Sequence, residues 1–94
     1  MHELGITRRV LEVVLDRAAA AGAERITNVQ IERGAESDIA PAALSFYWPD
    51  VSRGTIAEGA ILAFSTADDP WAFRVVSIDV AEPLARTREG VATT

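Results

Sequence analysis

The sequence contains 94 residues, with 9 Lys and Arg against 14 Asp and Glu, so its formal net charge at pH 7 is −5. This length predicts one small domain. A net negative chain without a cluster of basic residues lacks the positively charged stripe that binds a phosphate backbone, so nucleic acid is excluded as a partner.

The counts of cysteine and histidine limit the possible chemistry. The sequence has no cysteine, which excludes disulfides, thiolate metal sites and cysteine nucleophiles. Its one histidine is His2, so two histidines from a single chain cannot share a metal. There is no apolar run of about 18 residues and no signal-peptide pattern, so we expect a cytoplasmic protein that does not bind a membrane.

The first predicted element is an amphipathic helix from Leu4 to Ala21. Its apolar residues recur at helical spacing on one arc, and charged residues such as Glu12 and Asp16 lie opposite. Gly22 follows an alanine run and suits the left-handed position after a helix, so the helix is expected to end there.

A strand is predicted next, from Arg25 to Arg33, because apolar and polar residues alternate. The alternation places Thr27, Val29 and Ile31 on one face. Gly34 is expected to end this strand.

A second helix is predicted to begin at Pro41, in the first turn where a missing N–H costs nothing, and to end near Gly54. We interpret its aromatic run at residues 46–48 as core packing, with the Tyr47 hydroxyl at the surface. Pro49 removes a backbone hydrogen bond inside this helix, which predicts a kink or an early break near residues 45–48.

Two further strands are predicted at residues 60–66 and 71–82. The polar link at residues 67–70 is typical of a turn, which favours an antiparallel hairpin. The apolar alternation changes parity within the second of these strands, so a bulge is expected near Val76 and Ser77.

The order helix, strand, helix, strand, strand predicts an α+β fold with two layers. We expect a three-stranded, mostly antiparallel sheet with both helices on one face. Residues 1–83 would form the single domain, and residues 84–94, which show no period, would form a flexible C-terminal tail.

The residues Met1, His2 and Glu3 open the chain directly before the first helix. A free amine, the deprotonated amide nitrogen of His2 and its ring nitrogen Nδ1 can close two adjacent chelate rings on one metal. Planar nitrogen donation suits Ni(II) or Cu(II), whereas Zn(II) prefers a tetrahedron. Glu3 offers a fourth ligand. Taken alone, a histidine at position 2 is more commonly an exposed or helix-capping residue that binds no metal.

Five segments resemble, in order, the HypA/HybF family of nickel metallochaperones that act in nickel–iron hydrogenase maturation. They are Met-His-Glu-Leu at residues 1–4, residues 21–29, Pro-Ala-Ala-Leu at 41–44, Gly-Thr-Ile-Ala-Glu-Gly-Ala at 54–60 and residues 76–80. The stretch at 54–60 is the most specific of them.

The resemblance implies that His2 is the essential nickel ligand, supported by the Met1 amine and by Glu3. In some family members an acidic residue just before the second helix also approaches the metal. Asp38 is the nearby candidate for that position, although it is not a clean match.

The sequence departs from the family at two places. Members of the family carry a zinc ribbon with two cysteine pairs between the last two strands, and here residues 67–71 stand in its place, so no zinc is expected. Ile61, Ala63 and Val76 are apolar on the sheet face predicted to lie away from the helices. Together with Trp71, they favour a homodimer formed through the sheet.

The resemblance therefore predicts a nickel metallochaperone rather than an enzyme. Its implied partners are the large subunit of nickel–iron hydrogenase and a nickel-handling maturation GTPase. Paired carboxylates such as Asp68 and Asp69 lie in turns, where acidic residues are common for structural reasons, and no glycine-rich phosphate loop is present. The alternative function is a metal-independent adaptor or scaffold that keeps the fold and docks on the hydrogenase or a maturation partner.

Overall fold

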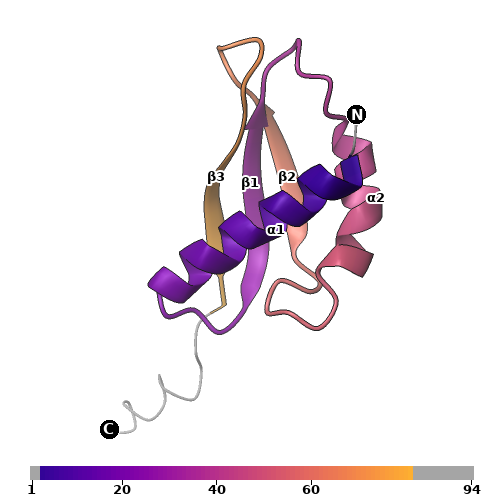
Figure 1. The fold of residues 1–94 in the computed structure, drawn as a ribbon. Coiled ribbons are helices and arrows are strands. Elements are labelled where there is room, and N and C mark those ends of the chain that lie inside the picture. Colours follow the sequence, from indigo (N-terminus) through magenta and orange to yellow (C-terminus); the bar gives the residue numbers. More distant parts are fainter. Residues whose placement is uncertain (1–2, 82–94) are drawn as a thin grey trace, which may run out of the picture.

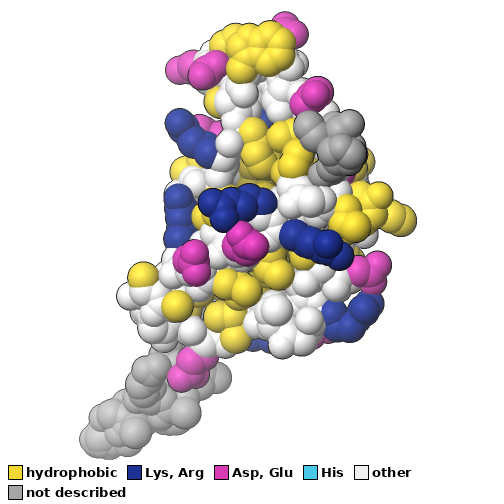
Figure 2. Space-filling view, viewed as in Figure 1, with side chains coloured by type: hydrophobic (Ala, Val, Ile, Leu, Met, Phe, Trp, Pro, Cys, Tyr) yellow, Lys and Arg dark blue, Asp and Glu magenta, His cyan; other side chains and the backbone are white. Residues whose placement is uncertain are grey.

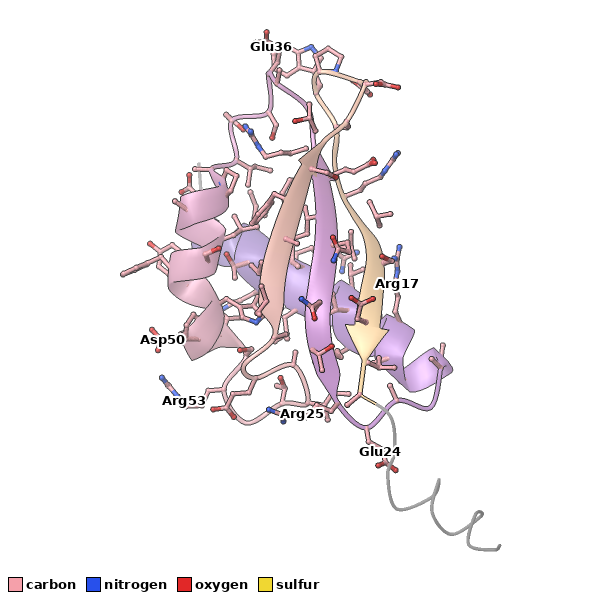
Figure 3. The ribbon with its side chains drawn as sticks, turned by 180° about the vertical axis from the view of Figure 1, so that it is seen from behind. Arg17, Glu24, Arg25, Glu36, Asp50 and Arg53 are labelled. Carbon is pink, nitrogen blue, oxygen red and sulfur yellow. The ribbon has the colours of Figure 1, made fainter. Side chains whose placement is uncertain are left out.

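The computed structural model describes residues 3–81, which form two helices and one three-stranded sheet (Figure 1). In chain order the elements are α1 (Glu3–Ala20), β1 (Ile26–Arg33), α2 (Pro41–Val51), β2 (Ile61–Thr66) and β3 (Phe73–Val80). Seen from behind, the sheet lies in front of α1, and α2 lies beside β2 at one edge of the sheet (Figure 3). The predicted α+β class and the order of elements are confirmed. The interpretation of residues 84–94 as a tail lies outside the described residues.

The central strand of the sheet is β1, because the strand order is β2-β1-β3. β2 pairs with β1 in parallel and β3 pairs with β1 antiparallel. The predicted hairpin between the last two strands is therefore wrong, and the sheet is mixed rather than mostly antiparallel. The physical reason is the connection between β1 and β2, which contains α2: a crossover through a helix brings two strands into parallel pairing.

The link between β2 and β3, residues 67–72, crosses the end of β1 to reach the other edge of the sheet. The backbone N–H of Gly34 donates to the carbonyl of Ala72 at 2.8 Å. A Cβ on Gly34 would lie well inside 3.0 Å of the backbone of Asp69 and Pro70, a separation that real Cβ atoms do not reach. The crossing therefore requires glycine at position 34. The sequence predicted only that Gly34 ends a strand, and the close approach of the link is an additional reason for this glycine.

The pairing of β1 with β3 contains a bulge at Val76. Gln30 pairs with Ser77 and the next residue, Ile31, pairs with Val75, so Val76 is an extra residue on β3. This confirms the predicted bulge near Val76 and Ser77.

A second register shift occurs at Thr27 on β1. Ile26 pairs with Val80 and Asn28 pairs with Asp79, which leaves Thr27 between them. Thr27 is exposed, whereas Ile26 is buried. The prediction that Thr27 shares the buried face of Val29 and Ile31 is wrong because the shift breaks the alternation.

The helix α1 ends as the sequence predicts. Gly22 has a φ of 69°. Its N–H donates to the carbonyl of Ala19 at 3.1 Å, and the N–H of Ala23 donates to the carbonyl of Ala18 at 2.9 Å. These two hydrogen bonds form a Schellman motif, which satisfies carbonyls that the end of the helix leaves open.

The helix α2 begins at Pro41 and continues through Pro49 to Val51. The predicted early break near residues 45–48 is wrong. Pro49 lies close to the end of the helix, where its fixed φ is compatible with helical backbone and a single hydrogen bond is lost. Leu44 and Trp48 are buried and hold the helix in the core.

The aromatic run of α2 divides between core and surface. Trp48 is 3% exposed, which confirms its predicted packing, but Phe46 is 75% exposed. The ring of Phe46 lies edge-on to that of Tyr47, with ring centroids 5.2 Å apart. The interpretation of Phe46 as core is wrong because successive helical residues point about 100° apart, so one buried stripe cannot hold three neighbours.

The core lies between the helices and the sheet. Its buried apolar residues are Val10, Val14, Ala18, Ile26, Val29, Ile31, Leu44, Trp48, Ala57, Ala60 and Val75. Within residues 3–81, neither helix is both long and apolar enough to cross a lipid bilayer.

Candidate metal centre

The first turn of α1 is stabilised by a hydrogen bond from a side chain of the same helix. Glu3 is the first helical residue and is partly buried. Thr7 is fully buried, and its hydroxyl donates to the carbonyl of Glu3 at 2.6 Å. A carboxylate at the start of a helix is favoured by the helix dipole. The helix therefore fixes the backbone of Glu3.

The loop that carries Asp38, residues 34–40, is held by an arginine from β1. The guanidinium of Arg33 donates to the carbonyl of Ile39 at 3.0 Å and to the carbonyl of Ser37 at 2.7 Å. The N–H of Ile39 donates to the hydroxyl of Ser37 at 3.3 Å. Asp38 lies between these residues and is exposed. The loop thus fixes its backbone while the Asp38 carboxylate faces solvent.

These two segments meet at one end of the molecule. Ile6 of α1 and Ile39 of the loop line the same cavity, whose volume is about 400 Å³. Figure 1 shows the start of α1 beside the loop that enters α2. The fold therefore brings the helical turn of Glu3 and the loop of Asp38 to one end. We call this end, made by the first turn of α1 and residues 34–40, the metal end.

Among residues 3–81, no three His, Cys, Asp or Glu side chains are grouped closely enough to hold a metal ion. Met1 and His2 lie outside the described residues. Of the four predicted ligands, the structure therefore places two, Glu3 and Asp38, and leaves Met1 and His2 as predictions.

The most specific segment of the resemblance, residues 54–60, forms most of a tight connection between α2 and β2. We call residues 52–60 the connector. Gly54 and Gly59 have φ values of 81° and 86°, which favour glycine. The hydroxyl of Thr55 donates to the carbonyl of Ser52 at 2.7 Å and accepts from the N–H of Ala57 at 3.1 Å. Ala57 is fully buried.

The connector is also tied to the start of β1. The N–H of Ile26 donates to the carbonyl of Ile56 at 2.9 Å, and the guanidinium of Arg25 donates to the carbonyl of Glu58 at 3.0 Å. Figure 3 shows Arg25 at this end of the molecule, opposite the metal end. These contacts give residues 54–60 a structural role.

The outer face of the sheet is less uniformly apolar than the sequence suggests. Ile61 and Val76 are 63% and 46% exposed, but they lie on the two edge strands. On the central strand β1, Gln30 and Glu32 alternate with the buried Val29 and Ile31, so they lie on the outer face between the two edge strands. Glu32 forms an ion pair with Arg74 at 2.6 Å. The predicted homodimer through the sheet stays a prediction.

Three arginines line the cavity that begins at the metal end, and no sequence pattern singles them out. Arg9 and Arg17 of α1 and Arg74 of β3 line the same cavity as Ile6 and Ile39. No motif joins them, since α1 and β3 lie far apart in the chain and only the packing of α1 against β3 brings them together.

The fold has a solved counterpart among nickel-handling proteins. The solution structure of the Ni metallochaperone HypA from Helicobacter pylori superimposes with a TM-score of 0.75, over 87% of this chain and 100% of that chain. The sequence identity is 14%, so this similarity defines the fold class alone.

Sequence comparison identifies the family. The chain is similar to the hydrogenase maturation factor HypA of Salmonella typhimurium (48% identical over 62 residues), of Klebsiella pneumoniae (44%) and of Escherichia coli (40%). The matches cover 66% of this chain and 52 to 54% of those proteins, so the chain spans about half the length of the relatives. The sequence model of the protein family described as hydrogenase/urease nickel incorporation metallochaperone, HypA, matches residues 1–70. The chain belongs to the HypA family.

The family match ends at residue 70, close to where the sequence was expected to depart from the family. Residue 70 lies inside the link between β2 and β3. In the structure residues 67–72 make this link, and the sequence contains no cysteine.

Proposed function

We propose that this protein is a nickel metallochaperone that binds Ni(II) through the Met1 amine, His2 and Glu3, with Asp38 as a further ligand. It would deliver the ion during nickel–iron hydrogenase maturation. The observation that carries the proposal is the family match, which starts at residue 1 and so includes the Met-His-Glu sequence.

The chemistry of these donors supports nickel rather than zinc. An amine, a deprotonated amide nitrogen and an imidazole nitrogen at successive positions favour a planar arrangement, which suits Ni(II). The carboxylate of Glu3 is the next donor along the chain, and the exposed carboxylate of Asp38 lies on the neighbouring loop. Glu3 is the first residue of α1, so the helix fixes its backbone directly after the proposed nitrogen donors.

Delivery would proceed by ligand exchange. A site made largely at a helix start leaves the ion accessible to donors of a recipient protein. Protons compete with Ni(II) for the nitrogen lone pairs, so a fall in pH weakens binding. None of these steps requires catalysis by the protein, and we propose that it is not an enzyme.

The proposed partners are the large subunit of nickel–iron hydrogenase and a nickel-handling maturation GTPase, in the cytoplasm. The short link at residues 67–72 and the absence of cysteine support a version of this function that does not use zinc.

The test is a calorimetric titration of Ni(II) into the protein with its native N-terminus. The His2→Ala variant and a form with two residues added before Met1 should each bind at least about 100-fold more weakly, since each loses a nitrogen donor. The matched control is Glu12→Gln, which removes an exposed carboxylate of α1 that is paired with Arg9 and should leave the affinity unchanged. Equal binding by all forms would rule out the N-terminal nitrogen site and support the metal-independent adaptor.

A further inference from the structure

An apolar groove runs along the junction of α1 and β3, on the helix-covered side of the molecule (Figure 2). Its volume is about 400 Å³. Its apolar lining consists of Ile6, Val10, Val13, Ile39, Phe73 and Val75. We call it the α1–β3 groove.

The charge of the groove differs from that of the chain. The whole sequence carries a net charge of −5, yet the charged residues that line the groove are Arg9, Arg17 and Arg74. No acidic residue is among its lining. A surface with an apolar floor and a positive rim is complementary to a ligand that combines apolar groups with carboxylates.

The arginines on α1 are able to receive such a ligand. Arg9 pairs with Glu12 at 2.7 Å, but the two side chains are 74% and 63% exposed, and an exposed pair of this kind contributes little and exchanges readily. Arg17 donates one N–H to the carbonyl of Val76 at 2.9 Å, and a guanidinium has five such donors. Figure 3 shows Arg17 beside β3. Arg74 is held by Glu32 at 2.6 Å, so Arg9 and Arg17 are the principal cations.

The shape of the groove favours a peptide. From Ile6 to Arg17 the lining of α1 covers eleven steps of about 1.5 Å, a length of about 16 Å. An extended peptide of about five residues has this length.

Addition of a strand to the edge of β3 is disfavoured. The bulge at Val76 interrupts the ladder, and Arg17 already binds the Val76 carbonyl. A peptide in the groove would therefore bind through its side chains.

We propose that the α1–β3 groove binds a short acidic peptide segment of a partner protein, with two or three large apolar side chains on the groove floor and carboxylates on Arg9 and Arg17. The groove ends at Ile6 and Ile39, beside the metal end. A bound segment would thus hold its protein next to the proposed nickel ligands. The binding itself does not depend on nickel.

The test is a selection of random octapeptides displayed on phage against the metal-free protein, followed by fluorescence anisotropy of synthetic copies of the enriched peptides. We expect the enriched peptides to combine large apolar residues with Asp or Glu. The double variant Arg9→Gln and Arg17→Gln should bind them at least about tenfold more weakly. Arg53→Gln, whose guanidinium pairs with Asp50 at the far end of α2, is the matched control and should bind normally.

A second variant keeps the test valid if loss of Arg17 disturbs the fold. The single change Arg9→Glu alters an exposed residue and keeps Arg17, and it should weaken binding of the enriched acidic peptides because it puts a carboxylate where the proposal requires a cation. Circular dichroism checks that each variant is folded.

The proposal is overturned if no peptide is enriched, if enriched peptides lack carboxylates, or if the groove variants bind them normally. It is also overturned if light scattering shows a dimer that Arg9→Glu dissociates into monomers, because a second copy of the chain would then occupy the groove. His2→Ala should bind the peptides normally, which separates this proposal from the nickel site.

Discussion

The connector and the metal end are built in opposite ways. In the connector, residues 52–60, hydroxyl and backbone groups are hydrogen-bonded to one another, and Ala57 is fully buried. At the metal end, the backbone is fixed by Thr7 and Arg33, while the carboxylate of Asp38 faces solvent. The connector contains residues 54–60 of the resemblance to the HypA family, and the metal end contains the last two residues of its Met-His-Glu-Leu segment.

This contrast indicates that the two regions have different roles, one in backbone structure and the other in metal binding. The connector residues satisfy backbone geometry, since two of them are glycines with positive φ and one is a threonine whose hydroxyl closes a turn. The Asp38 carboxylate, which faces solvent, satisfies no comparable structural demand. Changes in the connector are therefore expected to alter stability, and changes of the proposed ligand side chains to alter nickel binding.

The largest effect is expected where the metal end depends on the fold. Gly34→Ala would push a methyl group into the backbone of Asp69 and Pro70, and should lower the free energy of unfolding by about 3 kcal/mol. Urea denaturation measures this. The matched control, Gly22→Ala, meets no atom within 4 Å but has a φ of 69°, and should cost about 1 kcal/mol. Equal costs for the two variants would contradict the crossing of β1 by the link.

The pH dependence of nickel binding should be steep. Formation of the proposed site releases at least one proton from the His2 amide, so the affinity for Ni(II) should fall about tenfold for each unit by which pH is lowered. Titrations at several pH values measure the slope. An N-terminally extended form, which lacks the free amine next to His2, should bind weakly throughout. An affinity that does not change with pH would exclude the amide nitrogen as a ligand.

A smaller effect is expected in the connector. Thr55→Ala removes a hydroxyl that makes two hydrogen bonds, and should lower the free energy of unfolding by about 1 to 2 kcal/mol without changing nickel affinity. Thr55→Ser keeps the hydroxyl and should lose much less stability. Loss of nickel binding in folded Thr55→Ala would show that the connector takes part in the metal site.

The smallest effect is expected at the carboxylates. Glu3→Gln and Asp38→Asn should each weaken Ni(II) binding by about fivefold, or about 1 kcal/mol, because nitrogen donors supply most of the binding. Thermal unfolding without metal should be unchanged. Glu36→Gln alters an exposed carboxylate of the same loop and is the control. An effect of Glu36→Gln equal to that of Asp38→Asn would reduce Asp38 to a general electrostatic contribution.

Local patterns predicted the elements themselves. The first helix, its end at Gly22 and the bulge near Val76 follow from neighbouring residues and are confirmed. The errors concern pairing and orientation. The polar residues 67–70 predicted a hairpin turn between β2 and β3, but β1 lies between these two strands in the sheet. The sequence predicted that Phe46 and Trp48 are both core residues, but they point in different directions from α2, so Trp48 is buried and Phe46 is exposed.

The sequence by itself determined the class of fold, the order of elements and the family, because helical spacing, turn residues and ordered motifs are properties of short segments. It also placed three of the proposed ligands together, since Met1, His2 and Glu3 are successive residues. Only the tertiary structure decided that β1 is central and that Gly34 must be glycine. Only the packing of α1 against β3 brought Arg9, Arg17 and the apolar floor into one groove, because side chains from distant segments become neighbours through folding alone.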